Sequence, residues 1–206
     1  MNNPKGYDSI ARFYDLLARL VFGKSIALAQ THFLKEISFL ANVLVVGGGS
    51  GWWMKEFLRS RPHCKIVFID LSAEMIRLAR EGVQADKRVS FRCGSEESIT
   101  EVATFDVVIT FFFLDLFSSD SLPFLVRRIS ESLKPGGLWL VSDFVETRWW
   151  HSALLSAMYR FFRFTTGLQN QSLPDWNEIL LKNNLRPIDH NTFYSDFIRS
   201  GLYQSK

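Results

Sequence analysis

A run of glycines directly after an apolar segment is the first place in this chain where chemistry is expected. Residues 43–52 read VLVVGGGSGW, so four aliphatic residues lead into Gly47, Gly48 and Gly49, with Gly51 following. This pattern predicts a buried strand, a sharp turn and the start of a helix. Glycine permits positive φ and lets a ligand approach the main chain without meeting a Cβ atom. Because open α/β sheets form their ligand crevice at such a turn, we expect a nucleotide-like ligand here.

The next predicted strand ends in a carboxylate that suits the ribose of such a ligand. Asp70 closes the segment KIVFID, 23 residues after Gly47. An acid at this edge of a sheet can accept hydrogen bonds from ribose hydroxyls. Hydrogen bonds to a charged acceptor contribute about 1.5–3 kcal/mol each. The structural alternative is a carboxylate that only caps the turn at the end of the strand.

Alternating strands and helices are predicted to bring these residues to one edge of a sheet. We expect strands at 43–46, 65–70, 89–93, 105–112 and 138–142. Between them we expect helices at 51–60, 72–81 (with Ser72 as N-cap) and 120–133, then a Pro-Gly-Gly turn at 135–137. This alternation is typical of a parallel sheet wrapped by helices.

The two ends of the chain depart from this alternation. Helices are expected at 7–20 and 25–40 before the first strand, and at 148–164 and 174–183 after the last parallel one. Two further strands are expected at 187–194 and 197–204, joined only by Ser195 and Asp196. So short a connection forces antiparallel pairing, because parallel strands need a long crossover.

Several segments together resemble the class I S-adenosylmethionine-dependent methyltransferases. A dinucleotide-binding loop, G-x-G-x-x-G, would place its third glycine where this chain has Trp52. The chain instead has G-x-G-x-G at 47–51, which resembles motif I of the methyltransferases. IDLSAEMIRLAR resembles motif II, FDVVITFFFLDLF resembles motif IV, and LKPGGLWLVSDF resembles the segment through strand five. YDSIARFYD, from residue 7 to 15, resembles the family's opening helix.

The resemblance implies an α/β, Rossmann-like methyltransferase fold. Its seven-stranded sheet is mostly parallel, ends in a C-terminal antiparallel hairpin and has helices on both faces. We expect a single domain over 1–206 with three parts. These are an N-terminal helical cap (1–41), a cofactor-binding core (42–144), and acceptor-side helices with the terminal hairpin (145–206).

The resemblance also implies S-adenosylmethionine as the cofactor and assigns residues to it. The expected cofactor-binding residues are Gly47, Gly48, Gly49, Gly51, Asp70, Leu71, Ser95, Glu96, Thr110 and Tyr14. Ser95 stands where the family usually has an acid that accepts from the adenine amino group, and Glu96 could take over that role. Val45 stands where the family often has an acid, two residues before the first glycine. The cofactor's ammonium group would then need backbone carbonyls near Gly47 or Thr110, or a tyrosine hydroxyl.

Methyl transfer from a sulfonium is an in-line displacement, so the protein's main task is positioning. Positioning can supply roughly 7–11 kcal/mol. A general base would help with a hydroxyl or an enolisable carbon, and the candidates are Asp115, Asp143 and His151. Asp115 could instead begin a turn, and His151 could lie on a helix surface.

The segment 148–164 is expected to shape the acceptor pocket. It carries an apolar stripe of Trp150, Leu154, Met158, Phe161 and Phe162, opposite Ser152, Ser156, Arg160 and Arg163. With the phenylalanines at 111–113, this stripe predicts a small apolar or aromatic acceptor. A lipid-like acceptor reached by peripheral membrane contact is a second possibility, and a helix simply packed on the sheet is the plain alternative.

Composition argues against several other classes. With 24 basic and 21 acidic side chains the net charge is +3, and no Lys/Arg cluster indicates nucleic-acid binding. Cys64 and Cys93 lack metal-ligand spacing, and no metal is expected. No apolar signal region or spanning segment is seen, so we expect a cytoplasmic protein. The alternatives are a cofactor-binding protein without activity and a nicotinamide-dependent oxidoreductase. Trp52 and the terminal hairpin argue against the oxidoreductase.

Overall fold

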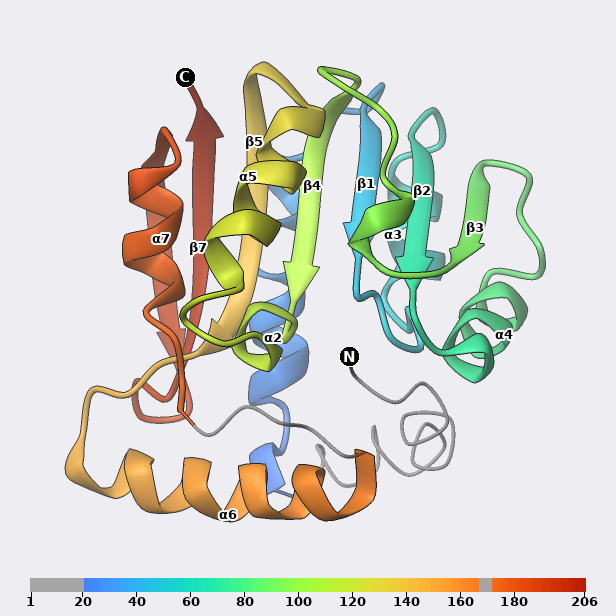
Figure 1. Cartoon of the computed structure of the whole chain (residues 1–206). Helices are drawn as coiled ribbons and strands as arrows, with labels where there is room; N and C mark the ends of the chain where they lie inside the picture. Colours follow the sequence, from blue (N-terminus) through green and yellow to red (C-terminus); the bar gives the residue numbers. More distant parts are fainter. Residues whose placement is uncertain (1–20, 167–171) are drawn as a thin grey trace.

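The computed structural model describes residues 21–166 and 172–206, which include a seven-stranded sheet (Figure 1). The strand order is β3-β2-β1-β4-β5-β7-β6. The bounds are β1 Asn42–Val46, β2 Lys65–Asp70, β3 Val89–Cys93, β4 Phe105–Phe111, β5 Leu133–Phe144, β6 Leu185–Phe193 and β7 Ile198–Ser205. The first five strands pair in parallel, whereas β7 is antiparallel to both β5 and β6. The expected mostly parallel sheet with a C-terminal antiparallel hairpin is therefore confirmed.

Helices cover both faces of the sheet because the central strands are apolar on both sides. In β1, Val43 and Val45 belong to one buried cluster, and Leu44 and Val46 belong to the other. This alternation follows from the two-residue period of a strand. The first cluster includes residues of α2 (Ser25–Thr31), α3 (Met54–Ser60) and α4 (Ala73–Gly82). The second includes residues of α5 (Leu122–Ser132) and α7 (Trp176–Lys182).

The long helix α6 (Trp149–Thr166) lies across the carboxyl ends of the parallel strands (Figure 1). Its buried row is His151, Leu155 and Tyr159, four residues apart, as one face of a helix requires. The predicted stripe through Trp150, Leu154 and Met158 is only partly buried and flanks that row. Ser152, Ser156, Arg160 and Arg163 are exposed, as predicted. The predicted inner face was therefore rotated by about one residue from the observed one.

The helix expected over residues 25–40 ends early, and this prediction was wrong in its second half. Helix α2 stops at Thr31, whose hydroxyl donates to the Ala27 carbonyl at 2.8 Å, and a 3₁₀ turn, η1 (Leu34–Glu36), follows. Arg61 donates to the carbonyls of Ile37 and Lys35, both at 2.9 Å. These long-range hydrogen bonds satisfy carbonyls that a continuous helix would have used itself. The helix expected over 7–20 lies outside the described residues.

Strand β5 begins earlier than predicted because the Pro-Gly-Gly segment forms an irregularity inside the strand. Phe105 pairs with Leu133, but Val107 pairs with Leu138, so the register shifts across 134–137. Gly136 has a φ of +78°, and a Cβ at Gly137 would lie 2.9 Å from the Lys134 carbonyl oxygen. Glycine is therefore required for the bend, and the expected turn is accommodated as a bulge.

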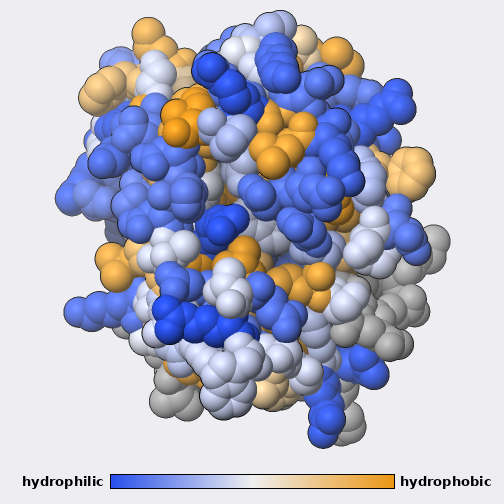
Figure 2. Space-filling model, turned by 90° about the vertical axis from the view of Figure 1, so that its left-hand side faces the viewer, coloured by the Kyte–Doolittle hydropathy of each residue, from blue (hydrophilic) through white to orange (hydrophobic). Residues whose placement is uncertain are grey.

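The outermost strand, β6, forms a polar edge. Most of its residues are exposed, and Pro187 lies where its register with β7 shifts. Figure 2 shows this side of the molecule, where hydrophilic residues cover most of the surface and hydrophobic ones form small separate groups. A proline and charged side chains on an edge strand disfavour pairing with another chain.

Candidate functional site

The glycine loop between β1 and α3 adopts a conformation that only glycine takes easily. Gly47, Gly49 and Gly51 have φ values of +64°, +59° and +58°. The Gly47 N–H donates to the Ile69 carbonyl at 2.9 Å, which ties the loop to the end of β2. A Cβ at Gly47 would lie 2.1 Å from the Phe113 ring, whereas one at Gly49 would meet nothing within 4 Å. The loop is therefore closed on the Phe113 side and open at Gly49, where a ligand can approach the main chain.

Close helix packing is provided by Gly51, not by the next position. A Cβ at Gly51 would lie 2.5 Å from Met54 Cε and 3.3 Å from Ala79 Cβ, which places α3 and α4 against the loop. Trp52 is 48% exposed, and its indole N–H donates to Gln30 Oε1 of α2 at 2.8 Å. The indole thus points away from this packing.

Asp70 connects the glycine loop to the start of α4. Its Oδ2 accepts from the Gly49 N–H at 2.8 Å and its Oδ1 accepts from the Ser72 N–H at 2.9 Å. Ser72 is the predicted N-cap, and its hydroxyl accepts from the Met75 N–H at 3.1 Å. These hydrogen bonds show that Asp70 holds the turn, and its role as a ribose acceptor stays a prediction.

The expected adenine side of the site is a short turn next to Asp70. The Gly94 N–H donates to the Asp70 carbonyl at 2.9 Å, and the Cys93 thiol donates to the Leu71 carbonyl at 3.7 Å. The turn continues as η2 (Glu96–Ser98), which is capped by Ser95 through its hydroxyl and the Glu97 N–H at 3.3 Å. The structure thus places the main chain of Asp70 and Leu71 next to the turn that carries Ser95 and Glu96, and their role toward adenine stays a prediction.

The remaining wall of the site is the turn that follows β4. Phe112 has a φ of +53°, an unfavourable value for a bulky residue, and its N–H donates to the Ser142 carbonyl at 2.7 Å. The next turn, η3 (Leu114–Leu116), follows directly. Asp143 Oδ2 accepts from the N–H groups of Phe113, Leu114 and Asp115 at 3.2, 2.9 and 3.3 Å. This carboxylate thus holds the strained turn that presses the Phe113 ring against Gly47.

Asp115 and Asp143 form a buried acid pair. Burial raises the pKa of Asp143 to about 7, although four backbone N–H groups lower it. Burial and the neighbouring Asp143 raise the pKa of Asp115 well above its usual range. Since Asp143 accepts all four N–H groups, Asp115 is the carboxyl that keeps a proton. The two predicted candidates for a general base therefore lie together, but Asp143 is fully engaged in holding main chain.

His151 lies apart from this pair, in an aromatic environment. It is fully buried, so the alternative of a surface position on the helix was wrong. Its Nδ1 accepts from the N–H groups of Thr147 at 3.0 Å and Arg148 at 3.2 Å. Nε2 therefore carries the proton, and no described residue accepts from it. The acceptor at Nδ1 is thus already used by the main chain, whereas Nε2 can donate to a ligand.

Two other predicted cofactor residues differ in how far the structure describes them. Thr110 is buried in β4, and its hydroxyl accepts from the Trp139 indole N–H at 2.9 Å, so only its main chain could serve a ligand. Tyr14 lies outside the described residues. Val45 is buried beneath the loop, 2.9 Å from the position of a Cβ on Gly48. It therefore fills space where a family acid would have provided a polar group.

Sequence reasoning missed two residues near the site. Tyr159 is buried on the inner face of α6, and its hydroxyl has no hydrogen-bond partner among the described residues. Its four-residue spacing from Leu155 was the available signal. Arg128 of α5 contacts the η2 turn from across the sheet edge, and no local pattern marks it.

Across 21–166 and 172–206, no group of three or more His, Cys, Asp or Glu residues could hold a metal. No described helix is long and apolar enough to cross a membrane.

Comparisons with known proteins agree with this site. A family described as "Methyltransferase domain" matches residues 43–137. Malonyl-[acyl-carrier protein] O-methyltransferase of Priestia megaterium is 27% identical over 93% of this chain and 68% of its own length. The enzyme of the same name from Halalkalibacterium halodurans is 32% identical over 50% of this chain and 38% of its own. Overall, the chain spans 38–68% of the length of the curated relatives it matches.

Solved structures show the same fold. The 1,6-didemethyltoxoflavin-N1-methyltransferase of Burkholderia thailandensis, with bound S-adenosylhomocysteine, superposes with a TM-score of 0.71 at 16% identity. That match covers 98% of this chain and 88% of the other. Together with the glycine loop and Asp70, these findings support a class I S-adenosylmethionine-dependent methyltransferase with S-adenosylmethionine as its cofactor.

Proposed function

We propose that this methyltransferase acts on a small acceptor with an apolar or aromatic body. The observation that carries the proposal is a cluster of aromatic rings at the carboxyl edge, beneath α6. Phe112 packs on Phe144 at 5.0 Å between ring centroids, and Phe144 packs on Phe197 at 5.1 Å. The other rings of this cluster are Phe22, Trp150 and Tyr194. The phenylalanines of the cluster are buried, so a flat ligand would pack on the partly buried rings of Trp150 and Tyr194.

The cluster adjoins the cofactor loop through consecutive residues. The Phe112 ring belongs to the cluster, while the Phe113 ring lies against Gly47. S-adenosylmethionine supplies an electrophilic methyl group on its sulfonium when bound. We assign the glycine loop and Asp70 to holding it, and the cluster to holding the acceptor on the opposite side of the Phe112–Phe113 turn. Holding both partners in line is the principal contribution that the protein can make.

The polar groups inside this apolar region suit recognition of the acceptor better than removal of its proton. Tyr159 Oη and His151 Nε2 are both buried donors without a described partner. Burial and the nearby Asp115 and Asp143 raise the pKa of Tyr159, which keeps the phenol protonated. We therefore assign Tyr159 to donating a hydrogen bond to an oxygen or nitrogen of the acceptor. A buried donor gains most from a ligand that supplies its missing partner.

A second candidate acceptor is a carboxyl group carried on a thioester. It is favoured by the similarity to two malonyl-[acyl-carrier protein] O-methyltransferases, one of which aligns with 93% of this chain. This acceptor would also satisfy a buried donor such as Tyr159, but its acidic head would meet the aromatic cluster. The two candidates thus differ in whether the acceptor is a ring or a charged chain.

Release of S-adenosylhomocysteine with different acceptors distinguishes the candidates. A panel of phenols and hydroxyquinones would be compared with malonyl-pantetheine at equal concentration. We expect turnover with aromatic acceptors, and turnover only with the thioester would replace the first candidate by the second. Binding of S-adenosylhomocysteine without turnover on any acceptor would favour a cofactor-binding protein without activity. For a lipid-like acceptor, co-sedimentation with anionic vesicles at low salt is required, and no binding would exclude the membrane version.

A further inference from the structure

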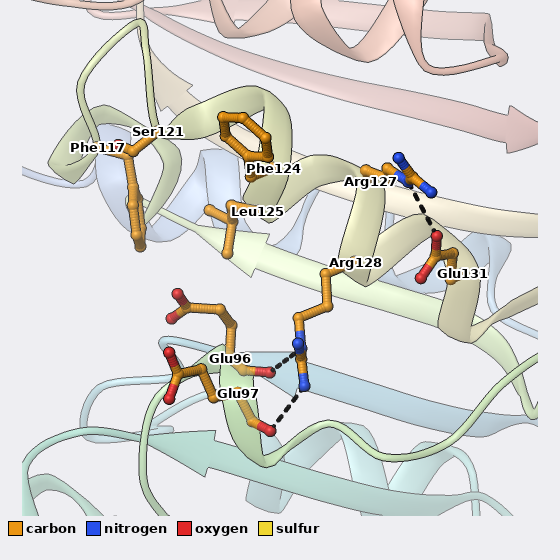
Figure 3. A pocket seen from close by; sticks show the side chains of 9 residues that line it. All are labelled: Glu96, Glu97, Phe117, Ser121, Phe124, Leu125, Arg127, Arg128 and Glu131. Carbon is orange, nitrogen blue, oxygen red and sulfur yellow. Dashed lines mark hydrogen bonds and ion pairs between the residues drawn. The ribbon is translucent and has the colours of Figure 1, made fainter.

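Arg128 on α5 makes an unusual set of contacts for an exposed arginine. Its Nε donates to the Glu96 carbonyl at 3.0 Å, and its Nη2 donates to the carbonyls of Glu97 and Ile99 at 2.9 and 3.3 Å. Figure 3 shows the side chain reaching from α5 to the main chain of Glu96 and Glu97, whose carboxylates point away from it. One guanidinium thus fixes three carbonyls of the same turn.

A second arginine completes the set from the opposite side of the turn. Arg92 Nη1 donates to the Ser98 carbonyl at 3.2 Å, and Arg92 is itself paired with Glu101. The carbonyls of four successive residues, 96–99, are therefore all held by guanidinium groups. Because these carbonyls face the arginines, the turn cannot rotate without losing several charged hydrogen bonds.

The turn held in this way lies beside the cofactor residues. Its first part is fixed to β2 by the hydrogen bond from the Gly94 N–H to the Asp70 carbonyl. At the far end Ile99 is buried in the second core cluster, and the carbonyls of residues 96–99 are held by the side chains of Arg92 and Arg128. From these contacts we propose that Arg128 is a positioning residue, which holds the η2 turn so that Ser95 and Glu96 can recognise the adenine of the cofactor. The proposal rests on the cofactor assignment, and it adds a residue from a different element, helix α5.

The adjacent arginine provides a matched control. Arg127 is also exposed on α5, but within the described part of the chain it pairs only with Glu131, at 3.1 Å and one turn further along the helix (Figure 3). Arg127→Gln removes the same charge and an i,i+4 ion pair, and it leaves the η2 turn unchanged. Any difference between Arg127→Gln and Arg128→Gln therefore reports on the contacts with the turn.

The test is calorimetric titration with S-adenosylhomocysteine and with its hypoxanthine analogue, S-inosylhomocysteine. The wild-type protein should prefer the adenine form. Arg128→Gln should weaken binding of S-adenosylhomocysteine by roughly 5- to 20-fold and bind the analogue almost unchanged, so that the preference shrinks. Arg128→Lys keeps the charge but not the planar guanidinium group. Its affinity for S-adenosylhomocysteine should therefore lie between those of the wild type and Arg128→Gln. Arg127→Gln should stay within about twofold of the wild type.

Each other result has a distinct meaning. Equal weakening of both ligands by Arg128→Gln would overturn the positioning role, because general loosening of the site does not select for adenine. Unchanged binding of both ligands would also overturn it. A wild-type protein that binds both ligands equally would overturn the adenine assignment of the turn. Failure of the wild type to bind S-adenosylhomocysteine at all would overturn the cofactor assignment itself. Thermal unfolding of each variant shows whether the fold is retained.

Discussion

Replacing Asp115 by asparagine tests whether the buried acid pair holds a proton. Asp115 is 6% exposed and Asp143 is 0% exposed, and both have a raised pKa. An unfolded carboxyl group titrates near pH 4, whereas burial raises the pKa of Asp143 to about 7. The folded protein therefore holds at least one more proton than the unfolded chain between these limits. By linkage, the stability that this pair contributes is fully present below about pH 4 and is lost as the pH rises through 7.

The size of the effect follows from the number of protons. One extra proton in the folded state lowers the free energy of unfolding by about 1.4 kcal/mol for each pH unit. In a domain of this size, about 1 kcal/mol corresponds to about 2–4 °C in Tm. Because of this pair, the Tm of the wild-type protein should fall by about 3–6 °C for each unit that the pH rises between pH 5 and pH 7. An asparagine at position 115 can still donate to Asp143 but removes one of the two titrating carboxyls, so this slope should become shallower in the variant.

Thermal unfolding from pH 5 to pH 8 at constant ionic strength measures the slope. The difference between wild type and Asp115→Asn cancels titrations elsewhere in the chain. Tyr159 of α6 interacts with the pair but stays protonated, and it is present in all variants. Asp120→Asn, at an exposed site on the same connection, is the control for net charge. If Asp115→Asn and the wild type show parallel Tm curves, the pair does not hold the proton and our account of Asp143 fails.

Three further predictions concern the two halves of the site. Asp70→Ala should weaken binding of S-adenosylhomocysteine by roughly 10- to 100-fold in calorimetry, and unchanged affinity would show that Asp70 is not the ribose acceptor. Gly47→Ala should lower Tm and abolish binding, because the new Cβ would lie 2.1 Å from the Phe113 ring, whereas Gly82→Ala in α4 has open space and should retain both. Tyr159→Phe removes a buried hydroxyl without a described partner, so Tm should stay equal or rise while turnover falls about tenfold at unchanged affinity for S-adenosylhomocysteine. Unchanged turnover would remove Tyr159 from the acceptor site.

Elements with a purely local signal could be predicted from the sequence. Strands β2 and β3 were predicted residue for residue because short apolar runs bounded by polar residues leave little choice of end points. The N-cap at Ser72 was predicted for the same reason. Helix α2 was predicted too long because its end depends on Arg61, which comes 30 residues after Thr31 in the chain. No local pattern carries that information.

The same contrast between local signals and long-range contacts applies to the site. The glycines and Asp70 were recognisable because their roles depend on the backbone of their own segment. Asp143 was predicted as a base, yet its oxygens are engaged by N–H groups 28–30 residues earlier in the chain. Arg128 was missed because its partners lie 29–32 residues away. A side chain whose function is to hold a distant turn gives no signal in its own neighbourhood.

Because Asp143 anchors main chain, its loss should affect catalysis differently from the loss of a general base. The two rings that follow β4 point in different directions because Phe112 adopts a positive φ, and Asp143 holds the N–H groups directly after it. The Phe112 ring packs on Phe144 in the aromatic cluster, while the Phe113 ring packs on the cofactor loop at Gly47. One carboxylate therefore sets the position of the proposed acceptor surface relative to the cofactor loop. In-line transfer tolerates little error in that relative position. Loss of Asp143 should thus slow transfer by misaligning the two partners, and raising the pH to compensate for a missing base should not restore it.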